Sequence, residues 1–225
     1  MSIRILAIDT STDSCSVAIW NQGEILSLSN LYPRNHEKFI LSMIQKLLKL
    51  GDFSLTQFNV LAFSCGPGSF TGIRIGMGII QGLAFGVDLP ILGISTLQTM
   101  AQGAWRIIGA KYVLSALDAQ MGKVYIGKFQ RQKDGIWKEY EKEGVFSEKQ
   151  VFINIKNIDK NWIYVGSGWK KYPHLVNGFE LNTYNGKVLL PQAEDILPLA
   201  VLNWKKGLAI SVENAKLVYL HDIFT

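Results

Sequence analysis

Residues 4–20 read RILAIDTSTDSCSVAIW, and residues 111–129 read KYVLSALDAQMGKVYIGKF. Both stretches place an apolar strand, an aspartate, a short polar turn and a second apolar strand in the same order. Asp118 of the later stretch therefore takes the place that Asp9 has in the earlier one. Such internal similarity indicates that one structural unit occurs twice in this chain.

The residues between the two copies predict the rest of the first unit. Apolar runs indicate strands, and runs with a period near 3.6 residues indicate helices. The predicted order is βββαβαβα, in which three antiparallel strands precede parallel crossovers, and it matches a ribonuclease H-like lobe. Duplication of such a lobe is typical of the actin-like α/β fold, which sugar kinases and the Hsp70 ATPase share. The expected strands are 4–9, 15–20, 24–29, 59–64 and 90–95, and the expected helices are 36–50, 69–86 and 96–104.

The second copy is predicted to be abbreviated. After its hairpin, the sequence indicates only one weak helix and one further strand. An apolar helix at 193–207 is expected to return to the first lobe. We therefore predict a first lobe of residues 1–108 with 190–225, and a smaller second lobe of residues 109–189.

Composition sets the class of protein. With 225 residues and 48% hydrophobic side chains, the chain can bury a large core. No apolar run is expected to reach the roughly 18 residues that span a bilayer, so the predicted location is cytoplasmic, with no membrane partner. Cys15 and Cys65 lack metal-binding spacing and are interpreted as reduced core residues. The net charge of +5 comes from scattered basic residues and is weak evidence for RNA binding.

Residues 66–78 read GPGSFTGIRIGMG, a glycine-rich stretch of the kind that can bind phosphate. A Walker A loop needs a lysine followed by a hydroxyl, yet no lysine occurs between Lys49 and Lys111. A dinucleotide-binding turn needs the spacing GxGxxG after the first strand, whereas this stretch has GxGxxxG after the fourth. Neither phosphate-binding motif is therefore present.

Four of the five glycines in the helix predicted at 69–86 lie on one stripe, and each costs about 0.5 to 1 kcal/mol relative to alanine. Some gain must offset this cost, and small residues at four-residue spacing allow another backbone to approach closely. We therefore interpret the glycines as a packing surface, either within the chain or against a partner helix. They are Gly72, Gly76, Gly82 and Gly86, beside an apolar stripe that begins at Phe70.

Asp9 and Asp118 end the first strand of each lobe, where ATPases of the actin-like fold place carboxylates that organise magnesium and phosphate. Those enzymes also need glycine beside the aspartate, whereas the residues that directly follow are Thr10-Ser11 after Asp9 and Ala119-Gln120 after Asp118. We predict that both aspartates hydrogen-bond the turns after their strands, as remnants of a nucleotide cleft. No catalytic or metal-binding residue is assigned, because the histidines are isolated and are expected at the surface or at helix caps. They are His36, His174 and His221.

Four stretches together resemble the TsaB family of bacterial tRNA threonylcarbamoyladenosine biosynthesis proteins. They read ILAIDTSTDSCSVAIW (5–20), CGPGSFTGIRIGMGIIQGLAFG (65–86), GISTLQTMAQGA (93–104) and LDAQMGKVYIGKF (117–129). The resemblance implies a noncatalytic subunit that works with a TsaD-type catalytic paralogue and a TsaE-type ATPase. Together these proteins transfer threonylcarbamoyl from its adenylate to the adenosine beside the anticodon. The resemblance implies ATP and a metal on the partners, no cofactor on this chain, and contact with tRNA through the complex.

The resemblance also implies an association surface on the first two helices, 36–50 and 69–86. The isolated chain is expected to form a homodimer through the surface that the paralogue otherwise occupies. The family's proline and arginine near Tyr219 are missing, so no role of that arginine is carried over. The alternative function is a small ATP-dependent phosphotransferase of the actin-like class. The predicted interface residues are Phe39, Met43, Leu47, Gly72, Ile75, Gly76, Ile79 and Leu83.

Overall fold

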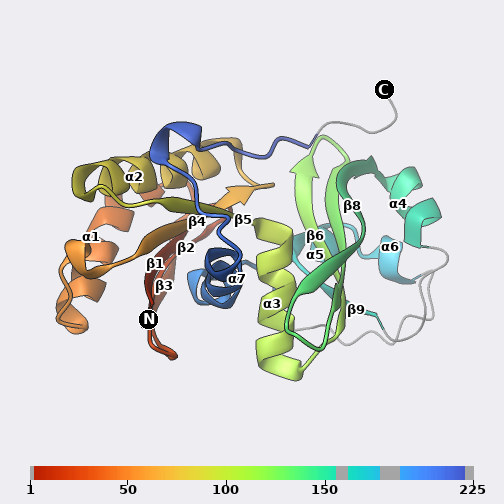
Figure 1. Cartoon of the computed structure of the whole chain (residues 1–225). Helices are drawn as coiled ribbons and strands as arrows, with labels where there is room; N and C mark the ends of the chain where they lie inside the picture. The colour runs from red at the N-terminus through yellow and green to blue at the C-terminus, as the bar shows by residue number, and fades with distance from the viewer. Residues whose placement is uncertain (1–2, 156–161, 178–187, 221–225) are drawn as a thin grey trace. The chain divides into compact units, whose positions relative to one another are not determined.

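The computed structural model describes residues 3–155, 162–177 and 188–220. The chain forms two compact units, each with its own sheet (Figure 1). The first unit comprises Met1–Thr99 and Pro191–Val218, and the second comprises Met100–Leu190 and Tyr219–Thr225.

The first unit is built on a five-stranded mixed sheet. Its strands are β1 (Arg4–Asp9), β2 (Ser14–Asn21), β3 (Glu24–Leu31), β4 (Val60–Gly66) and β5 (Ile91–Ser95). They lie in the order β3-β2-β1-β4-β5, and β1 pairs antiparallel with β2 but parallel with β4. The ribonuclease H-like order predicted from the sequence is therefore confirmed.

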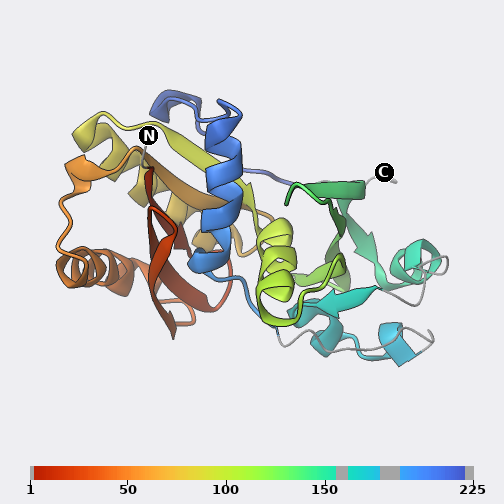
Figure 2. The same cartoon turned by 60° about the horizontal axis from the view of Figure 1, so that its bottom comes forward.

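Helices cover both faces of this sheet (Figure 2). α1 (His36–Leu50) and α2 (Phe70–Val87) pack on one face, and α7 (Ala193–Lys205) packs on the other. Leu6 and Ile8 of β1 belong to the core beneath α1 and α2. Because β1 is covered on both sides, its sequence is an apolar run without polar alternation. The predicted return of the last long helix to the first unit is confirmed.

α2 is long and apolar enough to cross a membrane by length and composition, contrary to the expectation that no such run occurs. In the structure this helix packs on the sheet with one of its faces. Its first turn is capped by Ser69, whose hydroxyl accepts a hydrogen bond from the Gly72 amide. The buried residues of α2 are Gly72, Ile73, Gly76, Ile80 and Ala84.

The segment after α7 lies along the open edge of β5. Ile210 and Ile91 exchange two backbone hydrogen bonds of 2.9 and 3.0 Å. Farther on, the Val218 amide donates to the Cys65 carbonyl near the end of β4 at 2.8 Å. This pairing protects a sheet edge that would otherwise be exposed. Two short 3₁₀ helices complete the unit, η1 (Leu55–Gln57) and η2 (Val212–Asn214).

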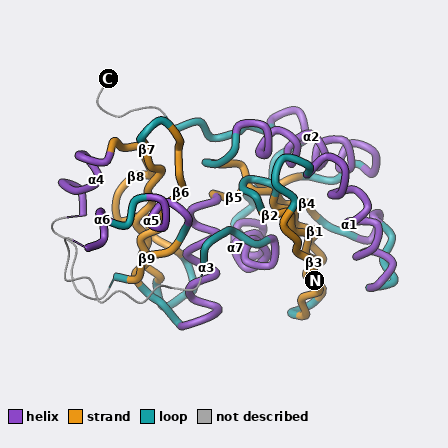
Figure 3. The backbone as a smooth tube through the Cα atoms, turned by 180° about the vertical axis from the view of Figure 1, so that it is seen from behind, coloured by secondary structure: helices purple, strands orange, loops and turns teal. Residues whose placement is uncertain are grey.

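The second unit repeats the first in shorter form. Its strands are β6 (Tyr112–Gln120), β7 (Lys123–Arg131), β8 (Trp137–Ser147) and β9 (Ile163–Val165), and its short helices are α4 (Glu148–Ile155), α5 (Ser167–Lys171) and α6 (His174–Asn177). The order β8-β7-β6-β9 corresponds to β3-β2-β1-β4, and no counterpart of β5 occurs among the described residues. The three short helices contribute to one core on the same face of the sheet (Figure 3). An abbreviated second copy was expected.

α3 (Thr96–Ile108) begins in the first unit, but its residues from Met100 onward belong to the second. The sequence had placed this boundary after residue 108. Hydrogen bonds explain the difference, because the Gln102 side-chain oxygen accepts from Trp137 Nε1 and from Arg131 Nη1, both at 3.0 Å. These bonds connect most of α3 to the second sheet.

Candidate functional site

The glycine-rich turn after β4 packs against the turn between β1 and β2. The Ser69 amide donates to the Ser11 carbonyl at 2.7 Å, and the Thr10 hydroxyl donates to the Gly72 carbonyl at 2.8 Å. A β-carbon on Gly68 or Gly72 would overlap the backbone oxygens of this turn. The space in which a phosphate would approach these backbone groups is therefore filled by the protein itself.

This packing corrects the interpretation of two predicted interface glycines. Gly72 and Gly76 are buried, and a β-carbon on Gly76 would lie 2.7 Å from Thr10 Oγ1. Of the two roles considered from the sequence, internal packing is the one the structure shows at these positions. Gly82 and Gly86 differ, because a β-carbon on either would have open space around it.

Asp9 is fully buried at the carboxyl end of β1. Its Oδ1 accepts from the Ser11 amide at 2.9 Å and from the Ser11 hydroxyl at 2.7 Å, while its Oδ2 accepts from the Ser64 hydroxyl. Burial raises the pKa of Asp9, and the hydrogen bonds from Ser64 and Ser11 oppose that rise. The predicted role in holding the turn is confirmed, but the side chain does not face an open cleft.

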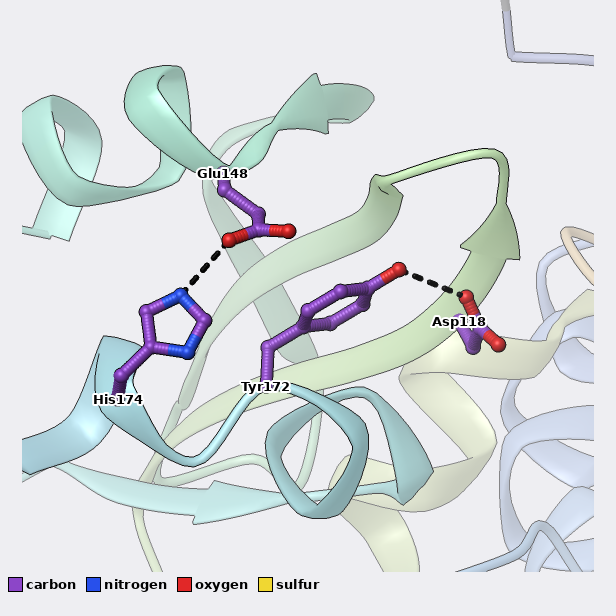
Figure 4. Close-up of polar contacts among 4 residues, drawn as sticks. All are labelled: Asp118, Glu148, Tyr172 and His174. Atoms are coloured by element: carbon purple, nitrogen blue, oxygen red, sulfur yellow. Dashed lines mark hydrogen bonds and ion pairs between the residues drawn. The ribbon is translucent and has the colours of Figure 1, made fainter.

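Asp118 occupies the matching position in the second unit and is only partly buried. Its Oδ1 accepts from the Gln120 amide at 2.9 Å and from the Tyr172 hydroxyl at 3.4 Å (Figure 4). Desolvation, followed by the nearby Asp118 charge, raises the pKa of Tyr172. Asp118 therefore also holds the turn that follows its strand, as the sequence predicted.

The histidines have different surroundings. His174 is exposed as predicted, and its Nε2 lies 2.7 Å from Glu148 Oε2 (Figure 4). His36 is only 5% exposed, so the expectation of a surface or capping side chain is wrong for this residue. Its Nδ1 has no hydrogen-bond partner among the described residues. His221 lies outside the described residues.

Across the described part of the chain, no group of three or more histidine, cysteine, aspartate or glutamate side chains is arranged to hold a metal ion. Cys15 and Cys65 are both buried and neither forms a disulfide with a described residue, which agrees with the prediction of reduced core cysteines. Burial raises the pKa of the Cys15 thiol to about 12, so this group is not a reactive thiolate near neutral pH.

The predicted interface residues divide into buried and accessible groups. Leu47 and Met43 belong to the core beneath α1, so they are corrected to internal residues. Phe39 is exposed at its edge and stacks on Tyr32, with ring centroids 4.0 Å apart. Ile75, Ile79 and Leu83 remain partly exposed along α2.

Two large apolar side chains of α2 were not predicted for this surface. Phe70 is 65% exposed, although it begins the apolar stripe of this helix, and Arg74 lies over its ring. Phe85 is 76% exposed beside Gly82 and Gly86. A helical wheel centred on the fully buried Ile80 places Phe85 on the outer face. Phe70, Phe85, Ile75 and Ile79 form an apolar surface on this helix, which we call the α2 face.

Comparison with known proteins shows which family this chain resembles. Residues 30–215 match the family described as TsaD, tRNA N6-adenosine threonylcarbamoyltransferase. The chain is 49% identical over 220 residues to the tRNA threonylcarbamoyladenosine biosynthesis protein TsaB of Escherichia coli (strain K12), with 98% of this chain and 95% of the relative covered. The protein of the same name in Haemophilus influenzae is 38% identical over 231 residues, which cover 100% of this chain and 96% of the relative.

A solved structure shows the same fold over the whole chain. The structure of YeaZ from Pseudomonas aeruginosa superposes with a TM-score of 0.87 and 38% sequence identity, covering 97% of this chain and 100% of that one. The likeness to YeaZ confirms the actin-like fold class. High identity over nearly complete chains leads to one conclusion: this chain belongs to the TsaB family of tRNA threonylcarbamoyladenosine biosynthesis proteins.

Proposed function

We propose that this chain is a noncatalytic subunit in the biosynthesis of threonylcarbamoyladenosine on tRNA, in the cytoplasm. Its relatives are named as tRNA threonylcarbamoyladenosine biosynthesis proteins. The state of Asp9 is the observation that supports a noncatalytic role. A phosphotransferase of this fold would need that carboxylate to face magnesium, whereas Asp9 is 0% exposed and bonded to Ser11 and Ser64.

We further infer that α1 and α2 bind a TsaD-type catalytic paralogue, and that a TsaE-type ATPase completes the complex. ATP and a metal would then be held by those partners, and tRNA would be reached through the complex. The α2 face supports this role, because Gly82 allows close approach while Phe85 and Ile79 offer apolar contact. In isolation, the same face would pair with a second copy of this chain in a twofold homodimer.

The α2 face can be tested with a substitution that the monomer tolerates. A side chain on Gly82 points into open space, so Gly82→Leu should not lower the melting temperature while it prevents close helix approach. Analytical ultracentrifugation should show that both the homodimer and the complex with the paralogue are weakened about tenfold or more. Lys205→Leu is the matched control, because it adds the same side chain at an exposed position of α7.

Function is then measured in a reaction reconstituted from the chain, its paralogue, the ATPase and unmodified tRNA. Modified nucleoside, quantified by mass spectrometry, should fall with Gly82→Leu and remain at the wild-type level with Lys205→Leu. Normal association by Gly82→Leu would show that the partner binds elsewhere. Hydrolysis of ATP by the purified chain alone, abolished by Asp9→Asn, would instead favour the phosphotransferase alternative.

A further inference from the structure

The positive charge of this chain is not shared between its two units. The first unit contains nine lysines and arginines against nine aspartates and glutamates, so its net charge is zero. The second contains fourteen basic against nine acidic residues, a difference of +5. The second unit thus carries the whole net charge of the chain, although its basic residues are scattered along the sequence.

Within the second unit, most described carboxylates are already paired, hydrogen-bonded or buried. Glu141 pairs with Lys128 at 2.6 Å, Glu148 pairs with His174, and Asp118 accepts from Tyr172. Asp134 accepts from the Ile136 amide, and Glu143 is buried. In contrast, seven lysines are exposed, and none of them forms an ion pair with a described residue. These lysines are Lys111, Lys133, Lys138, Lys142, Lys149, Lys170 and Lys171.

Three of these lysines lie on the short helices that cover one face of the second sheet. Lys149 is on α4, and Lys170 and Lys171 end α5. The contact between Glu148 and His174 joins α4 to α6, which begins three residues after Lys171 (Figure 4). We call Lys149, Lys170 and Lys171 the basic rim.

Lys170 and Lys171 of the basic rim differ from most other exposed lysines of this unit in their acidic neighbours. Lys133 and Lys138 each precede an acidic residue in the sequence, and Lys142 lies between two. The described segment 162–177, by comparison, holds Lys170, Lys171 and a histidine but no carboxylate. Glu148, which precedes Lys149, contacts His174, and Asp118 accepts from Tyr172, which follows Lys171. A surface of this kind presents positive potential that internal pairing does not cancel.

We propose that the basic rim of the second unit contacts the phosphate backbone of tRNA, while the first unit binds the protein partner. This inference rests on the proposed function, which supplies tRNA as the substrate. Lysines are suited to such contacts because each neutralises a phosphate and releases condensed counterions without reading the base sequence. The neutral first unit offers no comparable attraction.

A matched pair of double variants tests this assignment. Lys170→Gln with Lys171→Gln removes two charges at the end of α5, and Lys205→Gln with Lys206→Gln removes two charges at the end of α7 in the first unit. All four side chains are exposed, so both variants should fold normally. The measurement is binding of fluorescent tRNA by the complex of the chain and its paralogue, between 50 and 200 mM salt.

The α5 variant should bind about tenfold more weakly at low salt, and its plot of log affinity against log salt should be shallower by about 1 to 2. Replacement of the same two lysines by arginine should restore binding, and the α7 variant should behave as wild type. Equal losses in the α5 and α7 variants would overturn the inference, because charge alone would then explain binding.

The reconstituted reaction separates this inference from the proposed function. If tRNA binding is unchanged in the α5 variant while nucleoside formation still requires the chain, the basic rim is wrong and the proposed function stands. If nucleoside formation does not require the chain at all, the proposed function itself is wrong, and the rim loses the substrate on which it was argued.

Discussion

The turn between β1 and β2 and the turn between β6 and β7 follow the same sequence pattern but end in opposite environments. Thr10 and Ser11 of the first turn are buried against the start of α2. Met121 of the second turn is 99% exposed. The difference arises from the helix that follows the parallel strand, because α2 has 18 residues and α5 has five. The same hairpin is closed where a long helix packs on it and open where the helix is short.

A second pair of turns shows that the duplication extends beyond the hairpins. Gly66 ends β4 with φ of +112°, and Gly166 follows β9 with φ of +110°. Each turn comes after the strand that pairs parallel with the first strand of its unit. Both turns lead into a Gly-x-Gly step, and a β-carbon on Gly68 or Gly168 would press on that first strand or on the turn after it. Close packing therefore explains these glycines in both units, and phosphate binding is not needed to explain them.

The largest expected effect separates the two ends of α2. Gly72→Ala should destabilise the chain by about 3 kcal/mol, because its methyl group overlaps the Thr10 carbonyl and neither backbone can move away. Gly82→Ala should instead stabilise the chain by about 0.5 to 1 kcal/mol, since the exposed helix gains propensity without a clash. Urea unfolding of both variants measures the difference. Equal stabilities would show that the first hairpin does not pack on α2 as described.

The two aspartates at equivalent positions should respond unequally to removal. Asp9→Ala leaves the Ser11 amide and the Ser64 hydroxyl without an acceptor in a buried site, which should cost about 2 to 3 kcal/mol. Asp118→Ala should cost less than about 1 kcal/mol, because water can reach the partners of this partly exposed side chain. Chemical denaturation measures both values. A larger loss at Asp118 would mean that the second hairpin is the better packed one.

Asp9 should also affect how the stability of the chain depends on pH. Because burial raises the pKa of Asp9 in the folded chain above that of the unfolded chain, the folded state binds more protons than the unfolded state between these two pKa values. Stability from this group is thus present at low pH and is lost as pH rises through the folded pKa. Asp9→Asn should remove that loss, so the stability difference between variant and wild type should change over this window. A difference that stays constant with pH would show that the Asp9 pKa is not raised.

The sequence predicted the fold well because local and long-range signals agreed. The apolar runs at 4–9, 15–20 and 24–29 located the first three strands to within two residues, and the helix predicted at 69–86 lies within one residue of α2. The interface was predicted less well, because glycine spacing does not distinguish a chain's own turn from a partner helix. Only the position of Thr10 in three dimensions assigns Gly72 to the core and leaves Gly82 exposed.

The smallest expected effect concerns the open hairpin itself. Met121 has φ of +51° and precedes Gly122 in the two-residue turn, a conformation in which asparagine is far better tolerated than methionine. Its side chain is 99% exposed, so Met121→Asn should lose no contact and should stabilise the chain by about 0.5 to 1 kcal/mol. Gln22→Asn in the β2–β3 turn is the matched control, because Gln22 has φ of +55° and also precedes a glycine. The two gains, measured by urea unfolding, should be similar. If Met121→Asn destabilises the chain while Gln22→Asn stabilises it, then Met121 makes a contact that holds the second hairpin, and that hairpin is not open.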